Sequence, residues 1–244
     1  MATARQRNGT VYADGTADNF TIQNSGSIDA TGGAGSGVSV QVGSFTGDVQ
    51  SGLINNSGLI AGSGNDPLDA GVRLFGGAIG TTFSGDINND FGGTITGGSL
   101  AAAVLIDSNV QFDGDLNNAG VIDGSIFLND GDLNLAGTSE LFLDISSLTD
   151  FEVFETTGDL IADGSLSINF ENFSPLVGQT FDLFDFGFAS GSFDSIQADG
   201  FLLDTSDLLV GGSVTITAAV PEPGSLAVLG LAGLMFAGRR RRTR

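Results

Sequence analysis

The chain contains no cysteine, no histidine, no lysine and no tryptophan. Without cysteine there is no disulfide, no thiolate nucleophile and no cysteine-ligated metal site. Without histidine the chain lacks the side chain that most often acts as a general base or metal ligand near neutral pH. Polysaccharide lyases need a basic residue to take up a proton, which argues against a lyase. Hydrolysis of a glycosidic bond by two carboxyl groups is the reaction on sugars that the composition still permits. We therefore expect a protein that is not an enzyme.

Positive charge is scarce and concentrated at the two ends of the chain. Between positions 8 and 219 the only basic residue is Arg73, set against 28 acidic residues, which gives this part a net charge of −27. Binding to nucleic acid requires Lys and Arg to neutralise phosphates, so nucleic acid is excluded as a partner. Such an acidic body favours solubility, hydration and association with cations.

Glycine is abundant, with 39 residues, yet 41% of the chain is hydrophobic. That apolar content is too high for a disordered glycine-rich linker. Short clusters of Gly, Asn, Asp and Ser separate short runs of Val, Ile, Leu and Phe, which is typical of many short strands joined by tight turns. No long stretch before the C-terminal tail has a period of 3.6 residues, so we expect almost no helix there.

The first half of the chain contains an internal repeat. Four segments align: QNSGSIDATGG, NNSGLIAGSG, NNDFGGTITGG and NNAGVIDGS. Their anchors Asn24, Asn56, Asn89 and Asn118 are 32, 33 and 29 residues apart. Each unit holds about three short strands, and stacking of such units builds a continuous core. We expect Asn56, Asn89 and Asn118 to stack at one turn and to hydrogen-bond the backbone and each other.

This repeat predicts an all-β fold, a parallel β-helix or β-solenoid, over residues 20–138. Equivalent strands of successive coils would lie about 4.8 Å apart. Three units share a second element, FTGDV, FSGDI or FDGDL, and its Phe45, Phe83 and Phe112 are expected to form a buried aromatic ladder. The segment Gly62–Gly71 is expected to be an insertion on one face.

The last 25 residues, VPEPGSLAVLGLAGLMFAGRRRRTR, have a distinct organisation. The motif Val220, Pro221, Glu222 and Pro223 and one glycine are followed by 14 residues without charge, Ser225 to Gly238, too few for comfortable passage across a bilayer as a helix. A cluster of four arginines, Arg239, Arg240, Arg241 and Arg242, then provides a cytoplasmic stop. This order resembles the PEP-CTERM sorting signal of Gram-negative bacteria.

The resemblance implies processing by an exosortase, a precursor held in the inner membrane by the C-terminal hydrophobic helix, and a final location at the cell surface or outside the cell. It further implies association with exopolysaccharide or biofilm. Substrates of this kind carry a signal peptide, whereas residues 1–19 contain no apolar region of the required length. We therefore expect a signal peptide upstream of Met1.

Residues 139–219 contain less glycine and more Phe, Leu and Asp, often in alternation. The Thr157-Gly158-Asp159-Leu160 turn, the strand at Gly164, the turn at Pro175 and the strand from Phe181 resemble the C-terminal module of PEP-CTERM and autotransporter-like repeat proteins. We expect this β-rich module to cap the solenoid, because an exposed end invites edge-to-edge association. A separate small β-sandwich is the alternative. Residues 220–244 form the sorting signal.

Paired aspartates are the candidate metal ligands. Asp113 and Asp115 flank one glycine, and Asp130 and Asp132 flank another. The segment AGSGNDPLD, with Asp66 and Asp69, resembles one unit of calcium-binding RTX repeats, although one unit cannot complete such a site. Calcium takes six to eight oxygen ligands. Asp and Gly are equally the residues that turns prefer, so we expect no obligatory cofactor and keep calcium as a candidate.

These observations predict a non-catalytic exported protein that acts at the cell surface or in a polysaccharide matrix. Two alternatives remain. One is a carbohydrate-active β-helix hydrolase with two carboxylates in a groove along one face. The other is a calcium-dependent adhesin, whose melting midpoint would respond to calcium.

Overall fold

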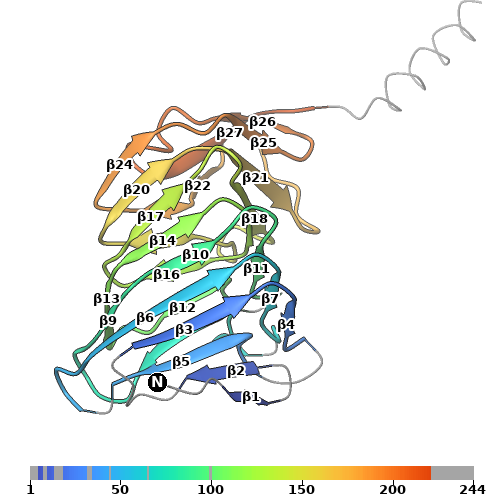
Figure 1. Ribbon diagram of the computed structural model, residues 1–244. Helices are drawn as coiled ribbons and strands as arrows, with labels where there is room; N and C mark the ends of the chain where they lie inside the picture. Colours follow the sequence, from blue (N-terminus) through green and yellow to red (C-terminus); the bar gives the residue numbers. More distant parts are fainter. Residues whose placement is uncertain are drawn as a thin grey trace, which may run out of the picture.

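The computed structural model describes residues 5–7, 10–13, 19–31, 35–43, 45–64, 66–98 and 101–220. Throughout these residues the regular structure is β, and the chain winds into a parallel β-solenoid (Figure 1). The predicted fold class is therefore confirmed. The predicted C-terminal helix lies outside the described residues, and among those that are described no helix is long and apolar enough to cross a membrane.

Three sheets form the faces of the solenoid, and their strands are parallel except for the antiparallel pair β1–β2. A small antiparallel sheet lies at the C-terminal end. Sheet A contains β1 (Arg5–Arg7), β2 (Thr10–Ala13), β5 (Val38–Val42), β8 (Val72–Gly76), β12 (Val104–Ile106), β16 (Ile126–Leu128), β19 (Phe154–Thr156) and β23 (Phe184–Asp185). Sheet B contains β3 (Asn19–Asn24), β6 (Val49–Asn56), β9 (Thr81–Ser84), β10 (Ile87–Asn89), β13 (Val110–Asp113), β14 (Asp115–Asn118), β17 (Asp132–Leu135), β20 (Asp159–Ala162) and β24 (Phe188–Gly191). Sheet C contains β4 (Ser27–Asp29), β7 (Leu59–Ala61), β11 (Thr94–Thr96), β15 (Val121–Asp123), β18 (Glu140–Ile145), β21 (Ser165–Phe170) and β25 (Ser195–Ala198). Sheet D contains β22 (Thr180–Asp182), β26 (Phe201–Asp204) and β27 (Ser213–Ala219).

Each coil visits sheets A, B and C in turn, and the repeat keeps equivalent residues in register from coil to coil. In sheet A, Val72 pairs with Val38 and Val104, and Val104 also pairs with Ile126. All four side chains are fully buried. Because successive residues of a strand point to opposite faces, the alternating apolar residues fill the interior and their neighbours face outward.

An aromatic ladder lies inside, but the prediction that Phe45 belongs to it is wrong. Phe83 stacks on Phe112 with ring centroids 5.9 Å apart and contacts Phe20 at 5.8 Å, whereas Phe45 is 74% exposed. In the second coil the residue in register with Phe83 is Gln50. Phe45 instead lies in a turn that Asp48 closes by accepting a hydrogen bond from the Phe45 amide at 2.8 Å.

The predicted asparagine ladder is confirmed. Asn24, Asn56 and Asn89 each donate a side-chain hydrogen bond to the next asparagine along the solenoid, at 2.8, 2.8 and 2.7 Å. Asn118 ends the row by donating to Ser139 Oγ at 2.6 Å. Asn56 and Asn89 also donate to backbone carbonyls of the turn. These buried amides are therefore paired, as buried polar groups must be if they are not to destabilise the fold.

A second amide ladder, which the repeat alignment did not predict, runs along the outer face of the same sheet. Asn55 donates to Gln23 at 3.1 Å, Asn88 to Asn55 at 2.8 Å, Asn117 to Asn88 at 2.9 Å and Asn134 to Asn117 at 3.0 Å. In this row the donors point toward the N-terminal coils, opposite to the inner row. The two rows of side-chain dipoles therefore oppose one another along the solenoid.

The solenoid sheets continue across residue 138, where the composition changes. β15 pairs with β18, β16 with β19 and β17 with β20, so this position marks no break in the sheets. The cap consists of sheet D, which buries Phe181, Val214 and Ile216 at the end of the core. β27, the last strand, ends at Ala219.

Candidate functional site

Two adjoining hollows lie on the outer side of sheet A and on the neighbouring corner between sheets C and A. We call them together the groove. The first hollow, of about 660 Å³, lies over sheet A, and the second, of about 780 Å³, lies over the corner. Phe127 lines both hollows, so the two adjoin at this side chain. The insertion at 62–71 contributes to both, with Leu68 in the first and Pro67 in the second.

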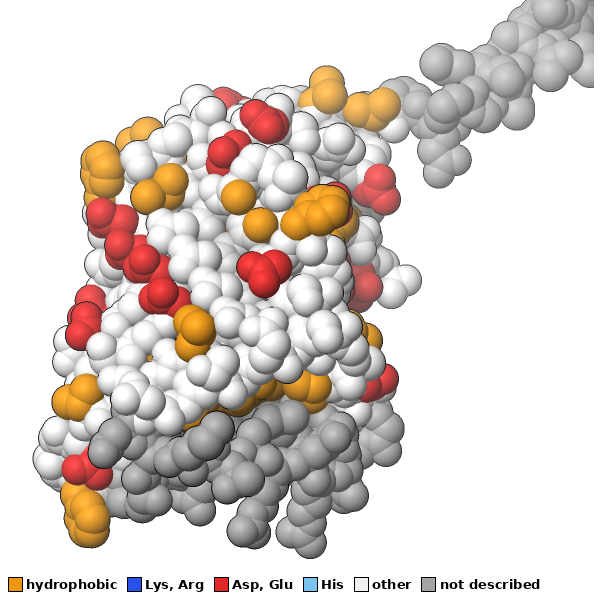
Figure 2. Space-filling model, in the orientation of Figure 1, with side chains coloured by type: hydrophobic (Ala, Val, Ile, Leu, Met, Phe, Trp, Pro, Cys, Tyr) orange, Lys and Arg blue, Asp and Glu red, His pale blue; other side chains and the backbone are white. Residues whose placement is uncertain are grey.

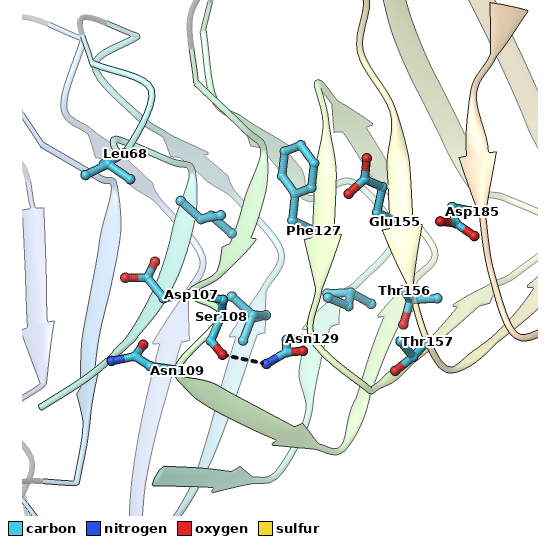
Figure 3. A pocket seen from close by; sticks show the side chains of 13 residues that line it. Leu68, Asp107, Ser108, Asn109, Phe127, Asn129, Glu155, Thr156, Thr157 and Asp185 are labelled. Atoms are coloured by element: carbon cyan, nitrogen blue, oxygen red, sulfur yellow. Dashed lines mark hydrogen bonds between the residues drawn. The ribbon is translucent and has the colours of Figure 1, made fainter. Parts of the chain in front are cut away.

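A column of outward side chains, one from each of five successive coils, passes through the first hollow. It consists of Arg73, Leu105, Phe127, Glu155 and Asp185, which occupy equivalent positions of β8, β12, β16, β19 and β23 and pair in register. The last four line the floor of the hollow, and Arg73 extends the column beyond Leu105. Figure 3 shows Phe127 standing between the Asp107 and Ser108 side of the hollow and Glu155 and Asp185. Because strands stack along the solenoid, this column runs parallel to its axis.

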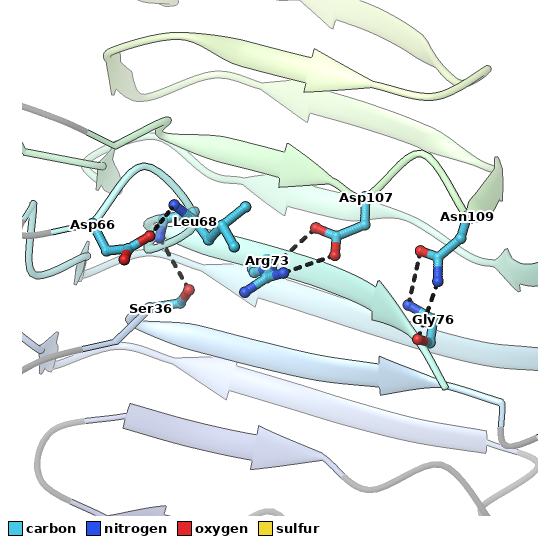
Figure 4. A network of polar contacts seen from close by, with 8 residues as sticks. Ser36, Asp66, Leu68, Arg73, Gly76, Asp107 and Asn109 are labelled. Atoms are coloured by element: carbon cyan, nitrogen blue, oxygen red, sulfur yellow. Dashed lines mark hydrogen bonds and ion pairs between the residues drawn. The ribbon is translucent and has the colours of Figure 1, made fainter. Parts of the chain in front are cut away.

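Arg73 is held in a fixed position at one end of the column. Its Nε and Nη2 donate to the two carboxylate oxygens of Asp107 at 3.0 and 2.7 Å (Figure 4). Its guanidinium lies 5.4 Å from the centroid of the Phe75 ring. A bidentate pair of this kind has fixed geometry and little free charge. The single cation of the body is therefore already neutralised.

The second hollow is strongly acidic. Asp123, Asp144, Asp150, Glu152 and Glu171 all line it. The amide of Asp144 donates to Glu152 Oε2 at 2.7 Å, and the Asp144 carboxylate accepts a bond of 3.0 Å from Asn169. The acidic side chains converge from β15, β18, the loop that follows β18 and the end of β21.

Glu152 has the most perturbed acidity in this hollow. Burial raises the pKa of Glu152 to about 8, with further increases from the negative charges of Asp144, Asp123 and Glu171, against a smaller opposing effect of the Asp144 amide. Burial and the charge of Asp144 also raise the pKa of Asp123. At neutral pH, Glu152 is thus a neutral carboxylic acid among carboxylates.

A third acidic feature, which we call the aspartate column, lies where the strands of sheet B begin. Asp115 pairs in register with Asp132, the Asp115 amide donates to Asp86 at 3.1 Å, and the Asp159 amide donates to Asp132 at 2.8 Å. Figure 2 shows acidic side chains in a staircase along this edge of the molecule. Burial, followed by the charges of Asp86 and Asp132, raises the pKa of Asp115.

The structure brings together only some of the predicted calcium ligands. Asp115 and Asp132 are neighbours in the aspartate column, whereas Asp113 and Asp130 lie in exposed positions outside it. Asp130 accepts hydrogen bonds from Gln111 at 3.2 Å and Thr157 at 3.3 Å.

The other two, Asp66 and Asp69, form hydrogen bonds within their own loop. Asp66 accepts from the Leu68 amide at 2.9 Å, and Asp69 accepts from the Ser63 hydroxyl. Within the described part of the chain, no group of three acidic side chains is arranged to hold a metal ion. Calcium binding stays a prediction, which melting with calcium and with a chelator would test.

Asp115→Asn is expected to stabilise the protein at pH 7. The folded-state pKa of Asp115 is raised, so its ionisation destabilises the fold as pH rises through that pKa. Like charges opposite one another across strands cost about 0.5 kcal/mol when solvent screens them. Chemical denaturation at pH 7 should show this gain in the free energy of unfolding. The gain should shrink in about 0.5 M NaCl, because the Debye length then falls to a few ångströms and the charges are screened from each other. Asp90→Asn, an exposed site outside the column, is the control, and an equal gain there would contradict the interpretation.

Sequence reasoning missed most of the groove. The repeat gives no signal for Phe127 or Glu152 as site residues. In the aspartate column it points to Asp159 only as part of a turn and does not point to Asp86 as a site residue. A signal for the column was present, since Gly-Asp-apolar recurs at Gly85, Gly114, Gly131 and Gly158.

The predicted sorting residues lie almost wholly outside the described residues. Only Val220 is described; it is exposed, and its amide donates to Gly200 O at 2.7 Å. Pro221, Glu222, Pro223 and the four arginines from Arg239 to Arg242 fall beyond it.

Residues 219–242 match the family described as the PEP-CTERM protein-sorting motif. No curated protein and no solved structure matches the chain. The predicted resemblance is thereby confirmed for the tail. The motif implies a secreted protein that an exosortase processes and that resides at the cell surface or outside the cell.

Proposed function

We propose that this protein is a non-catalytic component of the extracellular matrix or cell surface of a Gram-negative bacterium, where it associates with exopolysaccharide. The observation that carries the proposal is the sorting motif at residues 219–242, which is directly preceded by the last strand of the folded body. β27 thus ends at the residue where the signal begins. In the precursor, the hydrophobic tail holds this body at the inner membrane until processing.

The body suits a matrix role in its physical properties. Its repeated coils expose rows of amides and acids, such as the outer ladder from Gln23 to Asn134, that hold water and make many equivalent weak contacts. Its net negative charge keeps copies apart and soluble. The groove offers a defined place for a polymer chain.

Replacing Pro221, Glu222 and Pro223 with alanine is expected to block processing, because the motif is what the exosortase recognises. In the producing bacterium, immunoblots of fractionated cells should show an unprocessed precursor in the membrane fraction. The amount of protein in the matrix fraction should fall at least tenfold, a factor that corresponds to about 1.4 kcal/mol. Leu176→Ala combined with Val177→Ala, two exposed positions near the same end, is the control. An unchanged distribution of the motif variant would refute sorting through this tail.

A second candidate function is hydrolysis of a glycosidic bond in the second hollow. The observation in its favour is Glu152, a carboxyl group that burial keeps protonated at neutral pH, beside the carboxylate of Asp144. Such a pair supplies a general acid and a base or nucleophile. Incubation with polysaccharides and measurement of new reducing ends tests this function. Release that Glu152→Gln abolishes would support it, and no release from any polymer would favour the non-catalytic role.

A further inference from the structure

We infer that the groove binds a polysaccharide chain that carries free amino groups, with the chain lying along the solenoid axis over sheet A. This inference rests on the proposed association with exopolysaccharide. It goes further by naming the binding surface and the charge of the polymer.

The floor of the first hollow has the character of a sugar-binding platform. Leu105 and Phe127 lie side by side in register on β12 and β16, and both remain partly exposed although their strand neighbours Val104 and Ile126 are fully buried. A sugar ring has an apolar C–H face and polar edges, so it packs its face on an aromatic or aliphatic surface and needs polar groups beside it. A chain along the axis would place successive rings over successive coils.

Polar groups of fixed geometry stand beside this platform. Asp107 is fixed by the two bonds from Arg73, and Asn129 is fixed by donating to Val110 O at 2.6 Å and to Ser108 O at 3.3 Å (Figure 3). Side chains that are already ordered lose little conformational entropy when a ligand binds. The hollow is therefore organised before a ligand arrives.

The charges around the platform determine which sign of charge the bound polymer must carry. Beyond Phe127 the column continues with Glu155 and Asp185, both exposed. The adjoining hollow adds four further acidic side chains beside the protonated Glu152. Arg73, the only basic residue between positions 8 and 219, is occupied by Asp107. A polymer of uronic acids would be repelled along this whole path, whereas ammonium groups would be attracted.

Isothermal titration of the full chain with four oligomers of equal length tests the inference: glucosamine, N-acetylglucosamine, galacturonic acid and lysine. We expect glucosamine oligomers to bind most tightly and galacturonate oligomers not to bind. Phe127→Ala should weaken glucosamine binding about tenfold, as loss of a stacked aromatic contact does. Glu155→Lys, a substitution at an exposed position, should weaken glucosamine binding similarly by reversing a charge in the groove. Phe91→Ala removes a phenylalanine that is 77% exposed and lies outside the groove, and it should have no effect.

The outcomes separate this inference from the proposed function. Polysaccharide binding that is unchanged in both Phe127→Ala and Glu155→Lys would overturn the groove assignment and leave exopolysaccharide association standing. Preference for the galacturonate or the acetylated oligomer would overturn the amine assignment in the same way. Equal binding of the lysine oligomer would show a general cation surface and overturn the polysaccharide assignment. If no oligomer binds, both the groove inference and the proposed association with exopolysaccharide are overturned.

Discussion

Gly114→Ala is expected to destabilise the solenoid strongly, by about 3 kcal/mol, the range of an overpacked core. Gly114 joins β13 to β14, and a methyl group there would overlap the carbonyl oxygen of Gly85 in the preceding coil. The obstacle is backbone that is itself fixed, since the Gly85 amide donates to Asp113 O at 3.2 Å. The added carbon therefore forces successive coils apart.

Thermal unfolding followed by circular dichroism measures this effect. A loss of 3 kcal/mol should lower the midpoint by about 10 °C in a chain of this size. Because coils contact only their neighbours, the defect should also broaden the transition by separating the coils on its two sides. Gly26→Ala is the matched control, because a methyl group at Gly26 meets nothing within 4 Å. Midpoints within about 2 °C of each other for the two variants, less than 1 kcal/mol, would contradict the expected clash.

The inner asparagine ladder could be predicted because it requires the same residue in every coil. An amide that donates to the next coil and accepts from the previous one leaves an unpaired buried group if one member is replaced. Identity at Asn24, Asn56, Asn89 and Asn118 is therefore visible in the sequence. The aromatic ladder constrains the sequence less, because a position in it needs only a side chain that fills the available volume. Gln50 occupies the place in register with Phe83, and Gly52 lies against the Phe20 ring.

The groove could be predicted only in part. Arg73, Leu105 and Phe127 hold the same position in the aligned strands VRL, VLI and IFL, so their alternation with buried residues places them in one outward column. The depth of the hollow depends on the insertion that carries Pro67 and Leu68, whose path no repeat specifies. Glu152 lies on a loop that has no counterpart in the other coils. Its unusual acidity is a consequence of burial, which periodicity alone does not reveal.

Glu152 should make the stability of the protein fall as pH rises from about 4.5 to about 8. The pKa of this carboxyl is about 8 in the folded state against an ordinary value of 4.5. Below 4.5 it is protonated in both the folded and unfolded states and costs nothing. Between these values only the unfolded state loses the proton, so the free energy of unfolding declines, and above 8 the loss is complete.

Glu152→Gln is therefore expected to raise stability at pH 8.5 by about 2 kcal/mol, since water in the open hollow reduces the effect below the roughly 5 kcal/mol of a full shift. Glutamine keeps an acceptor oxygen for the Asp144 amide and cannot ionise beside Asp144, Asp123 and Glu171. Urea denaturation from pH 4 to pH 9 should show the variant and the wild type converging near pH 4 and diverging as pH rises. Glu140→Gln, an exposed position on the same strand as Asp144, should follow the wild type throughout. Parallel curves for Glu152→Gln and the wild type would mean that Glu152 is ionised in the folded protein, and the proton donor of the hydrolytic candidate would be lost with it.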